Sequence, residues 1–245
     1  MEILEKINPV RPSRISDAVF NFLIEEILLG NIKPGEKIPP ERVLAEKFSV
    51  HRNSVREALK KLEMLGLVEI RHGEGTFVSS LTDRGNILLL EYIMQNPDVV
   101  TIKILKDLIR MREVLECDAA MEAAINRTEE DLEIMDEILY QEAKHIADPP
   151  YFTTLDFQFH RAIFKASKNI VLQLMLNSIK STYTTFTGIF FSDPSVIPYV
   201  HQKHEELYLA VKEKNPDLSV EIMKELLKHG EEHLLKKLEG GEENG

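Results

Sequence analysis

Residues 39–78 read PPERVLAEKFSVHRNSVREALKKLEMLGLVEIRHGEGTFV, and this stretch decides the fold of the first part of the chain. Its first half predicts a short helix from Glu41 and a longer one, joined by a tight connection at residues 49–51. Gly66 ends the longer helix. The apolar residues then alternate on both sides of a turn at residues 71–75, which is the pattern of a β-hairpin.

A further helix is predicted before this stretch. Apolar residues recur at helical spacing over residues 15–27, and Gly30 with Pro34 stops the pattern. Three helices followed by a hairpin are typical of a winged helix-turn-helix, which binds DNA. We therefore assign residues 1–80 to a winged helix-turn-helix DNA-binding domain.

The remainder of the chain, residues 81–245, shows helical periodicity only. Short segments that contain Pro or Asn interrupt it, so we predict an antiparallel bundle of about seven helices that binds an effector and forms a dimer. The fold class is therefore mostly α. The helices are expected over residues 87–94, 99–125, 129–146, 152–167, 171–190, 196–212 and 218–238.

Charge is distributed unevenly along the 245 residues, whose formal net charge is −11. Of the 30 basic and 41 acidic residues, 12 of each lie in residues 1–80, which leaves 18 basic against 29 acidic in the second part. Residues 42–72 nevertheless carry a basic excess that suits a DNA-binding surface. A single cysteine, Cys117, and the lack of a signal or membrane-spanning segment predict a cytoplasmic protein with no membrane partner.

The outward face of the second helix within residues 39–78 carries donors for base edges and phosphates. In a helix-turn-helix this helix lies in the major groove, its first turn favours a phosphate, and the hairpin tip reaches the neighbouring minor groove. A solvated helix face is the alternative for any one of these residues. The candidate DNA-binding residues are Arg42, His51, Arg52, Asn53, Ser54, Arg56, His72 and Gly73.

Three side chains of the second part can converge inside the predicted bundle. Asp156 and His160 lie four residues apart on one helix face, and His204 falls on the apolar stripe of its own helix. A carboxylate and two imidazoles suit a first-row transition metal, although an inward histidine is often a core residue with satisfied hydrogen bonds. Arg112, in the middle of a long helix, requires an anionic partner, either an effector or an internal carboxylate.

Residues 39–78 resemble the DNA-binding domain of the GntR family of bacterial transcription regulators. The segments Asp156-Phe-Gln-Phe-His160, residues 166–169 and residues 112–116 resemble the FCD ligand-binding domain of its FadR-like branch. The resemblance implies that residues matching the eight candidates above contact operator DNA. One recognition helix covers only a few base pairs, so we expect a homodimer on a palindromic operator.

The FCD resemblance also implies a divalent metal such as Zn or Ni, held by Asp156, His160, His204 and one more histidine. Leu226 stands at that last position, and His229, one turn later, is the candidate replacement. The resemblance places Arg112 in the effector cavity, which favours a small carboxylate.

A second effector stays open, because residues 174–194 are similar to the fatty-acid-responsive regulator for which the branch is named. That regulator binds long-chain acyl-CoA without a metal. We therefore predict a ligand-responsive transcription regulator that senses either a small carboxylate with a metal or an acyl-CoA. A metal-dependent hydrolase is a remote alternative, because no general base or substrate-positioning residues accompany Asp156, His160 and His204, so we do not expect an enzyme.

Overall fold

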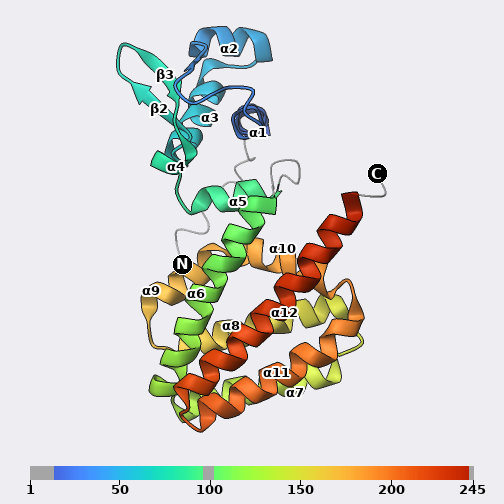
Figure 1. Ribbon diagram of the computed structural model, residues 1–245. Coiled ribbons are helices and arrows are strands. Elements are labelled where there is room, and N and C mark those ends of the chain that lie inside the picture. Colours follow the sequence, from blue (N-terminus) through green and yellow to red (C-terminus); the bar gives the residue numbers. More distant parts are fainter. Residues whose placement is uncertain (1–13, 96–101, 243–245) are drawn as a thin grey trace, which may run out of the picture. The chain divides into compact units, whose positions relative to one another are not determined.

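The computed structural model describes residues 14–95 and 102–242, which form two compact units. The first contains the elements α1 to α5 and the second contains α6 to α12 (Figure 1). The described part of the chain is mostly helical, as predicted. Among the described helices, none is both long enough and apolar enough to cross a membrane.

The first unit is a three-helix fold with a small antiparallel sheet, as the sequence predicts. The sheet has the strand order β1-β3-β2, so the predicted hairpin gains a third short strand that the sequence did not indicate. The elements are α1 (Arg14–Leu28), β1 (Lys37–Ile38), α2 (Glu41–Phe48), α3 (Arg52–Met64), β2 (Val68–Arg71) and β3 (Gly75–Val78).

The core of this unit lies between α1 and α3. The inward face of α3 is fully buried at Val55, Ala58 and Leu62, and it packs on the buried apolar face of α1. Gly66, between α3 and β2, has φ +77°, and a Cβ there would lie 1.8 Å from the carbonyl oxygen of Arg84. Only glycine fits this turn, which leads the chain from α3 into the hairpin.

Two short helices beyond the predicted domain boundary after residue 80 also belong to the first compact unit. These are α4 (Leu81–Arg84) and α5 (Leu88–Gln95). The Asn86 side chain between them donates to the carbonyl oxygen of Met64 at 2.7 Å. The ring of Tyr92 packs edge-on against Phe20 of α1, with the ring centroids 5.1 Å apart. These contacts tie both helices to the helix-turn-helix core.

The second unit is a bundle of helices that cross one another at varied angles (Figure 1). The single helix predicted over residues 171–190 is two helices, because Ile179 leaves the helical region with φ −105° and ψ 10°. The elements are α6 (Ile102–Asn126), α7 (Glu129–Lys144), α8 (Pro149–Ala166), α9 (Ile170–Ser178), α10 (Lys180–Phe191), the 3-10 turn η3 (Pro194–Val196), α11 (Ile197–Lys212) and α12 (Pro216–Glu242).

Small residues on α6 let its neighbours approach closely. Ala119, Ala120, Ala123 and Ala124 are completely buried, and α6 packs against both α8 and α12. Large aromatic side chains of α8 and α10 fill the remaining interior. The core therefore surrounds α8, the helix that carries Asp156 and His160.

Candidate functional site

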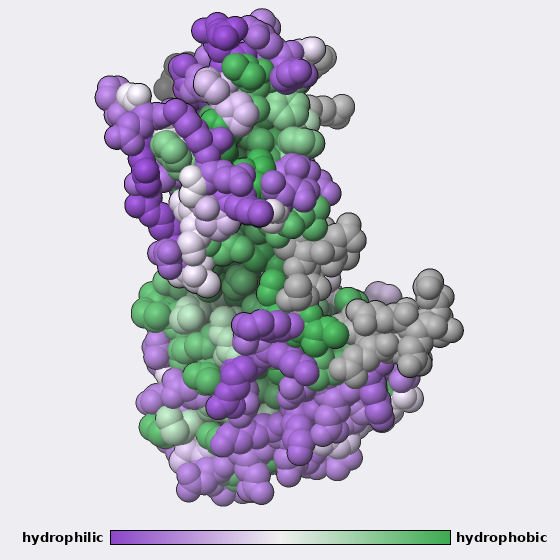
Figure 2. All heavy atoms as spheres, turned by 45° about the horizontal axis from the view of Figure 1, so that its top comes forward, coloured by the Kyte–Doolittle hydropathy of each residue, from purple (hydrophilic) through white to green (hydrophobic). Residues whose placement is uncertain are grey.

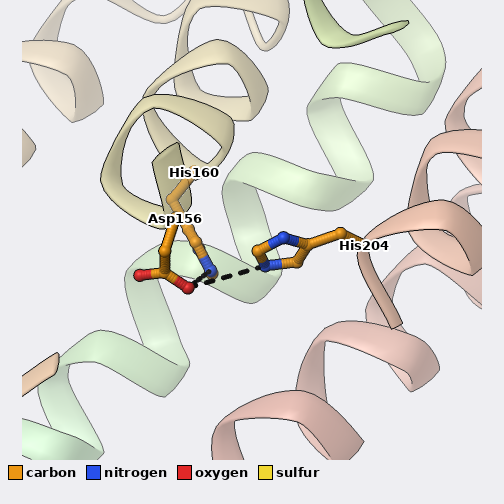
Figure 3. Close-up of side chains that lie close together, drawn as sticks. All are labelled: Asp156, His160 and His204. Atoms are coloured by element: carbon orange, nitrogen blue, oxygen red, sulfur yellow. Dashed lines mark ion pairs between the residues drawn. The ribbon is translucent and has the colours of Figure 1, made fainter. Parts of the chain in front are cut away.

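Asp156, His160 and His204 come together in the interior of the helical unit. The first two project from α8 and the third from α11, and all three point to one spot (Figure 3). One ligand atom from each lies within 4.8 Å of the others, and all three side chains are buried. The convergence that the spacing of Asp156, His160 and His204 predicts is therefore present.

The distances within this group suit a metal ion better than direct hydrogen bonds. Asp156 Oδ1 lies 3.7 Å from Nε2 of His204 and 3.9 Å from Nε2 of His160, which is too far for a hydrogen bond. Ligand atoms around a tetrahedral Zn²⁺, each bonded at about 2.0–2.2 Å, lie about 3.4 Å apart. The two distances from Asp156 therefore exceed the spacing around a tetrahedral ion by only a few tenths of an ångström.

A second layer of polar groups surrounds the three candidate ligands. Glu142 Oε1 lies 2.9 Å from Nδ1 of His204, and Glu116 forms an ion pair with Nδ1 of His160. The Tyr183 hydroxyl donates to Asp156 Oδ2 at 2.9 Å. The Nε2 atom of His204 is buried without a hydrogen-bond partner in the part of the chain that the structure describes.

The charges of this cluster do not balance. Glu116, Glu142 and Asp156 are at most 4% exposed, and Arg112 pairs with one of them, through an Nε–Glu116 hydrogen bond of 2.6 Å. Three carboxylates and one guanidinium leave two negative charges when the histidines are neutral. Buried charge is costly unless it is paired, and one divalent cation neutralises this excess.

The pKa values of Asp156 and His204 are both shifted upwards, by different causes. Burial raises the pKa of Asp156 above its usual value despite the neighbouring histidines. Burial would lower the pKa of His204, but Glu142 and Asp156 raise it above the usual value. Both shifts favour the protonated form, for Asp156 because burial disfavours its bare carboxylate and for His204 because the carboxylates favour its charged ring.

Arg112 both forms an internal salt bridge and lines a cavity, which were the two alternatives considered for it. Its Nε atom pairs with Glu116, and its guanidinium lies over the ring of Tyr183, 4.2 Å from the centroid. It also lines a cavity of about 50 Å³ together with Asp156, His160 and Tyr183. An anion in this cavity would therefore meet Arg112 together with Asp156 and His160.

The structure does not bring His229 to the metal group. Leu226 lines the cavity, as the expected histidine would, but His229 lies three residues further along α12 and is turned away by about 60° of helix rotation. Its ring packs against those of Tyr199 and His233, each centroid 4.1 Å away. In this arrangement of the helices His229, the predicted replacement ligand, therefore stays outside the group of Asp156, His160 and His204.

The sequence analysis missed the partners of the histidines. Glu142 lies on the buried stripe of α7 that includes Leu132, Met135 and Leu139. An acidic residue at helical spacing within an apolar stripe is an unusual position, because carboxylates are rarely buried without a partner. The position of Glu142 in this stripe could have indicated that its carboxylate has a buried partner.

All but one of the eight candidate DNA-binding residues are exposed on the first unit, and Ser54 is half-buried. Arg42 pairs with Glu46 at 2.7 Å, and Arg56 forms a two-pronged pair with Glu41 of α2. Arg52, at the start of α3, forms no ion pair within the described residues. The hairpin that carries His72 and Gly73 projects from the unit and is mostly hydrophilic (Figure 2).

Comparison with protein families agrees with both units. Residues 15–78 match the bacterial regulatory proteins of the gntR family, and residues 107–229 match the FCD domain. The chain belongs to the GntR family. It is accordingly a DNA-binding transcription regulator of the GntR/FCD type and not an enzyme.

Individual GntR relatives extend the match over most of the chain. The HTH-type transcriptional regulator LutR of Bacillus subtilis is 35% identical over 74% of this chain and 84% of its own length. A fatty acid metabolism regulator protein of Pasteurella multocida is 26% identical over 84% of this chain and 83% of its own. A solved structure of Lar, which controls the agr system of Listeria monocytogenes, is 17% identical, covers 94% of this chain and 99% of its own, and superimposes with a TM-score of 0.60. That last likeness concerns the fold alone.

Proposed function

We propose that this regulator binds a palindromic operator as a homodimer, and that a small carboxylate bound with a divalent metal controls its affinity for DNA. The observation that carries the proposal is the convergence of Asp156, His160 and His204 in a buried cluster that holds three carboxylates and one guanidinium. The metal and the effector belong to the helical unit, and the DNA contacts belong to the winged helix-turn-helix.

Asp156, His160 and His204 would hold the metal, because each presents one ligand atom to the same spot. Mixed imidazole and carboxylate ligands suit Zn, Ni and related ions. Three protein ligands leave coordination positions open, so the bound ion supplies a Lewis-acidic contact for an oxygen of the effector. Leu226 occupies the position of the fourth expected ligand and leaves an apolar wall there.

Arg112 would bind the carboxylate of the effector. Its Nε atom is used by Glu116, while the structure gives its terminal guanidinium nitrogens no hydrogen bond among the described residues. Two parallel hydrogen bonds from these nitrogens to a carboxylate are strong and directional. Glu116 contacts both Arg112 and His160, so the anion-binding group and the metal group share one side chain.

The size of the cavity separates the two candidate effectors. Its volume of about 50 Å³ holds a few water molecules or a small anion. Cavities for larger ligands have volumes of roughly 300–1,000 Å³. A small carboxylate therefore fits without rearrangement, whereas the long-chain acyl-CoA suggested by residues 174–194 and by the fatty-acid regulator requires the bundle to open.

DNA recognition would use two copies of the chain. Arg52, Asn53 and Arg56 on α3 would enter the major groove, and Arg42, His51 and Ser54 would fix the helix on phosphates. His72 and Gly73 at the hairpin tip would reach the minor groove. A two-fold dimer then matches a palindromic site, because each recognition helix reads one half.

Thermal melting separates the two effector hypotheses. We expect Zn²⁺ or Ni²⁺ at 100 times its dissociation constant to stabilise the protein by about 2.7 kcal/mol, because the ion binds the folded state. For a chain of this length that corresponds to a rise in Tm of roughly 5–10 °C. Long-chain acyl-CoA should produce no comparable rise.

Two variants identify the site in the same assay. The double variant His160→Ala, His204→Ala should lose the rise in Tm caused by the metal. His229→Ala, a matched histidine outside the group, should keep it. A rise in Tm that survives in the double variant, or a rise with acyl-CoA alone, contradicts the proposed effector site.

A further inference from the structure

Two buried carboxylates stand behind the two histidines of the candidate metal group. Glu142 of α7 is completely buried, and Glu116 of α6 is 1% exposed. Each reaches the Nδ1 atom of one ring, Glu142 that of His204 and Glu116 that of His160. The same atom of both rings is therefore engaged by a carboxylate from a different helix.

This pattern favours one tautomer of each ring when the imidazole is neutral. A neutral imidazole carries one proton, and a carboxylate acceptor at Nδ1 holds that proton there. The lone pair then lies on Nε2, which is the atom that faces Asp156 in both His160 and His204. Carboxylates that accept from the second nitrogen of a ligand histidine orient the ring and increase its basicity.

We propose that Glu116 and Glu142 are positioning residues that prepare His160 and His204 for the divalent metal. This inference rests on the proposed function, because it assigns two further residues to the same site. The two carboxylates do not touch the ion. They act through the rings that they hold.

Asp131, another buried acid of the same unit, has contacts typical of a structural role. Asp131, 4% exposed, caps the first turn of α7 through Thr128 and pairs with Lys168. Glu142, on the same helix, forms hydrogen bonds with the two histidines His201 and His204 and has no lysine or arginine partner among the described residues. A buried carboxylate without such a partner adds little to the stability of the fold.

Glu116 is less suited to a clean test than Glu142. It also accepts from Arg112, so a substitution there leaves a buried guanidinium without its carboxylate. Glu142→Gln is therefore the main variant, and Glu116→Gln is the second. Asp131→Asn is the matched control, because it removes a buried carboxylate that lies away from His160 and His204.

The test measures Zn²⁺ alone against the full-length metal-free protein by isothermal titration calorimetry, together with the Tm of each metal-free variant. We expect Glu142→Gln and Glu116→Gln to bind Zn²⁺ about 10–100-fold more weakly than the wild type. Glu142→Gln should keep the Tm of the metal-free wild type within a few degrees. Asp131→Asn should show the reverse, with a lower Tm and an unchanged affinity for Zn²⁺.

Two results would overturn the inference in distinguishable ways. If the wild type binds no Zn²⁺, the proposed metal site and the positioning role both fall. If the wild type binds Zn²⁺ and His160→Ala does not, while Glu142→Gln and Glu116→Gln keep full affinity, only the positioning role falls. Should Glu142→Gln fail to fold, Glu142→Asp replaces it, because the shortened carboxylate no longer reaches Nδ1 of His204 and the same loss of affinity is expected.

Discussion

Replacing His160 by alanine should abolish metal binding and the response to the effector, while the metal-free protein keeps its affinity for operator DNA. The ring supplies one of three ligand atoms, and its loss leaves too few protein ligands for a stable site. We expect the affinity for Zn²⁺ to fall by more than the roughly 10–100-fold typical of substitutions around a metal ligand. Calorimetry and a DNA-binding assay with and without the metal measure the two effects.

His160 lies in the helical unit, whereas the residues proposed to contact DNA lie in the other compact unit. His229→Ala is the control, because it removes a histidine of α12 that the structure places outside the group. A His160→Ala protein that still binds Zn²⁺ as the wild type does, or that responds normally to its effector, contradicts the proposed site. Under the acyl-CoA alternative the same substitution is nearly silent.

Replacing Arg52 by alanine should weaken operator binding by about 1–3 kcal/mol, roughly 5–150-fold, and relax the sequence preference. Arg52 is exposed at the start of α3 and forms no ion pair among the described residues, so its guanidinium is available to a base edge. Adding Arg56→Ala should reduce binding further, although Arg56 must share its guanidinium with Glu41. Fluorescence anisotropy with the DNA upstream of its own gene measures these affinities.

Lys60→Ala is the matched control for the recognition helix. Lys60 lies on α3 and is also exposed, but two turns after Arg52, so its loss should change binding little. Unchanged binding after Arg52→Ala and Arg56→Ala together would exclude α3 as the recognition helix.

The sequence predicted the elements whose patterns are local. The helix-turn-helix follows from the apolar spacing around Val55 and Leu62 and from Gly66, whose positive φ ends α3. The convergence of Asp156, His160 and His204 followed from helical faces alone. The first compact unit continues past residue 80 because α5 packs on α1 through Tyr92, a tertiary contact with no local signal.

The remaining differences also depend on tertiary contacts. The strand β1 has two residues and exists only because it pairs with β3. Whether His229 could reach the metal group depended on the rotation of α12, which packing against α6 and α11 decides. Glu142 belongs to a helix 62 residues away from His204, so its hydrogen bond could not be inferred from spacing.

Native mass spectrometry of the purified protein, combined with metal analysis, tests the central claim most directly. We expect a homodimer that carries one divalent transition metal per chain, and we expect the metal to be absent from His160→Ala. A dimer without metal that retains a long-chain acyl-CoA would contradict the account, because the cluster of Asp156, His160 and His204 would then have no ion to bind.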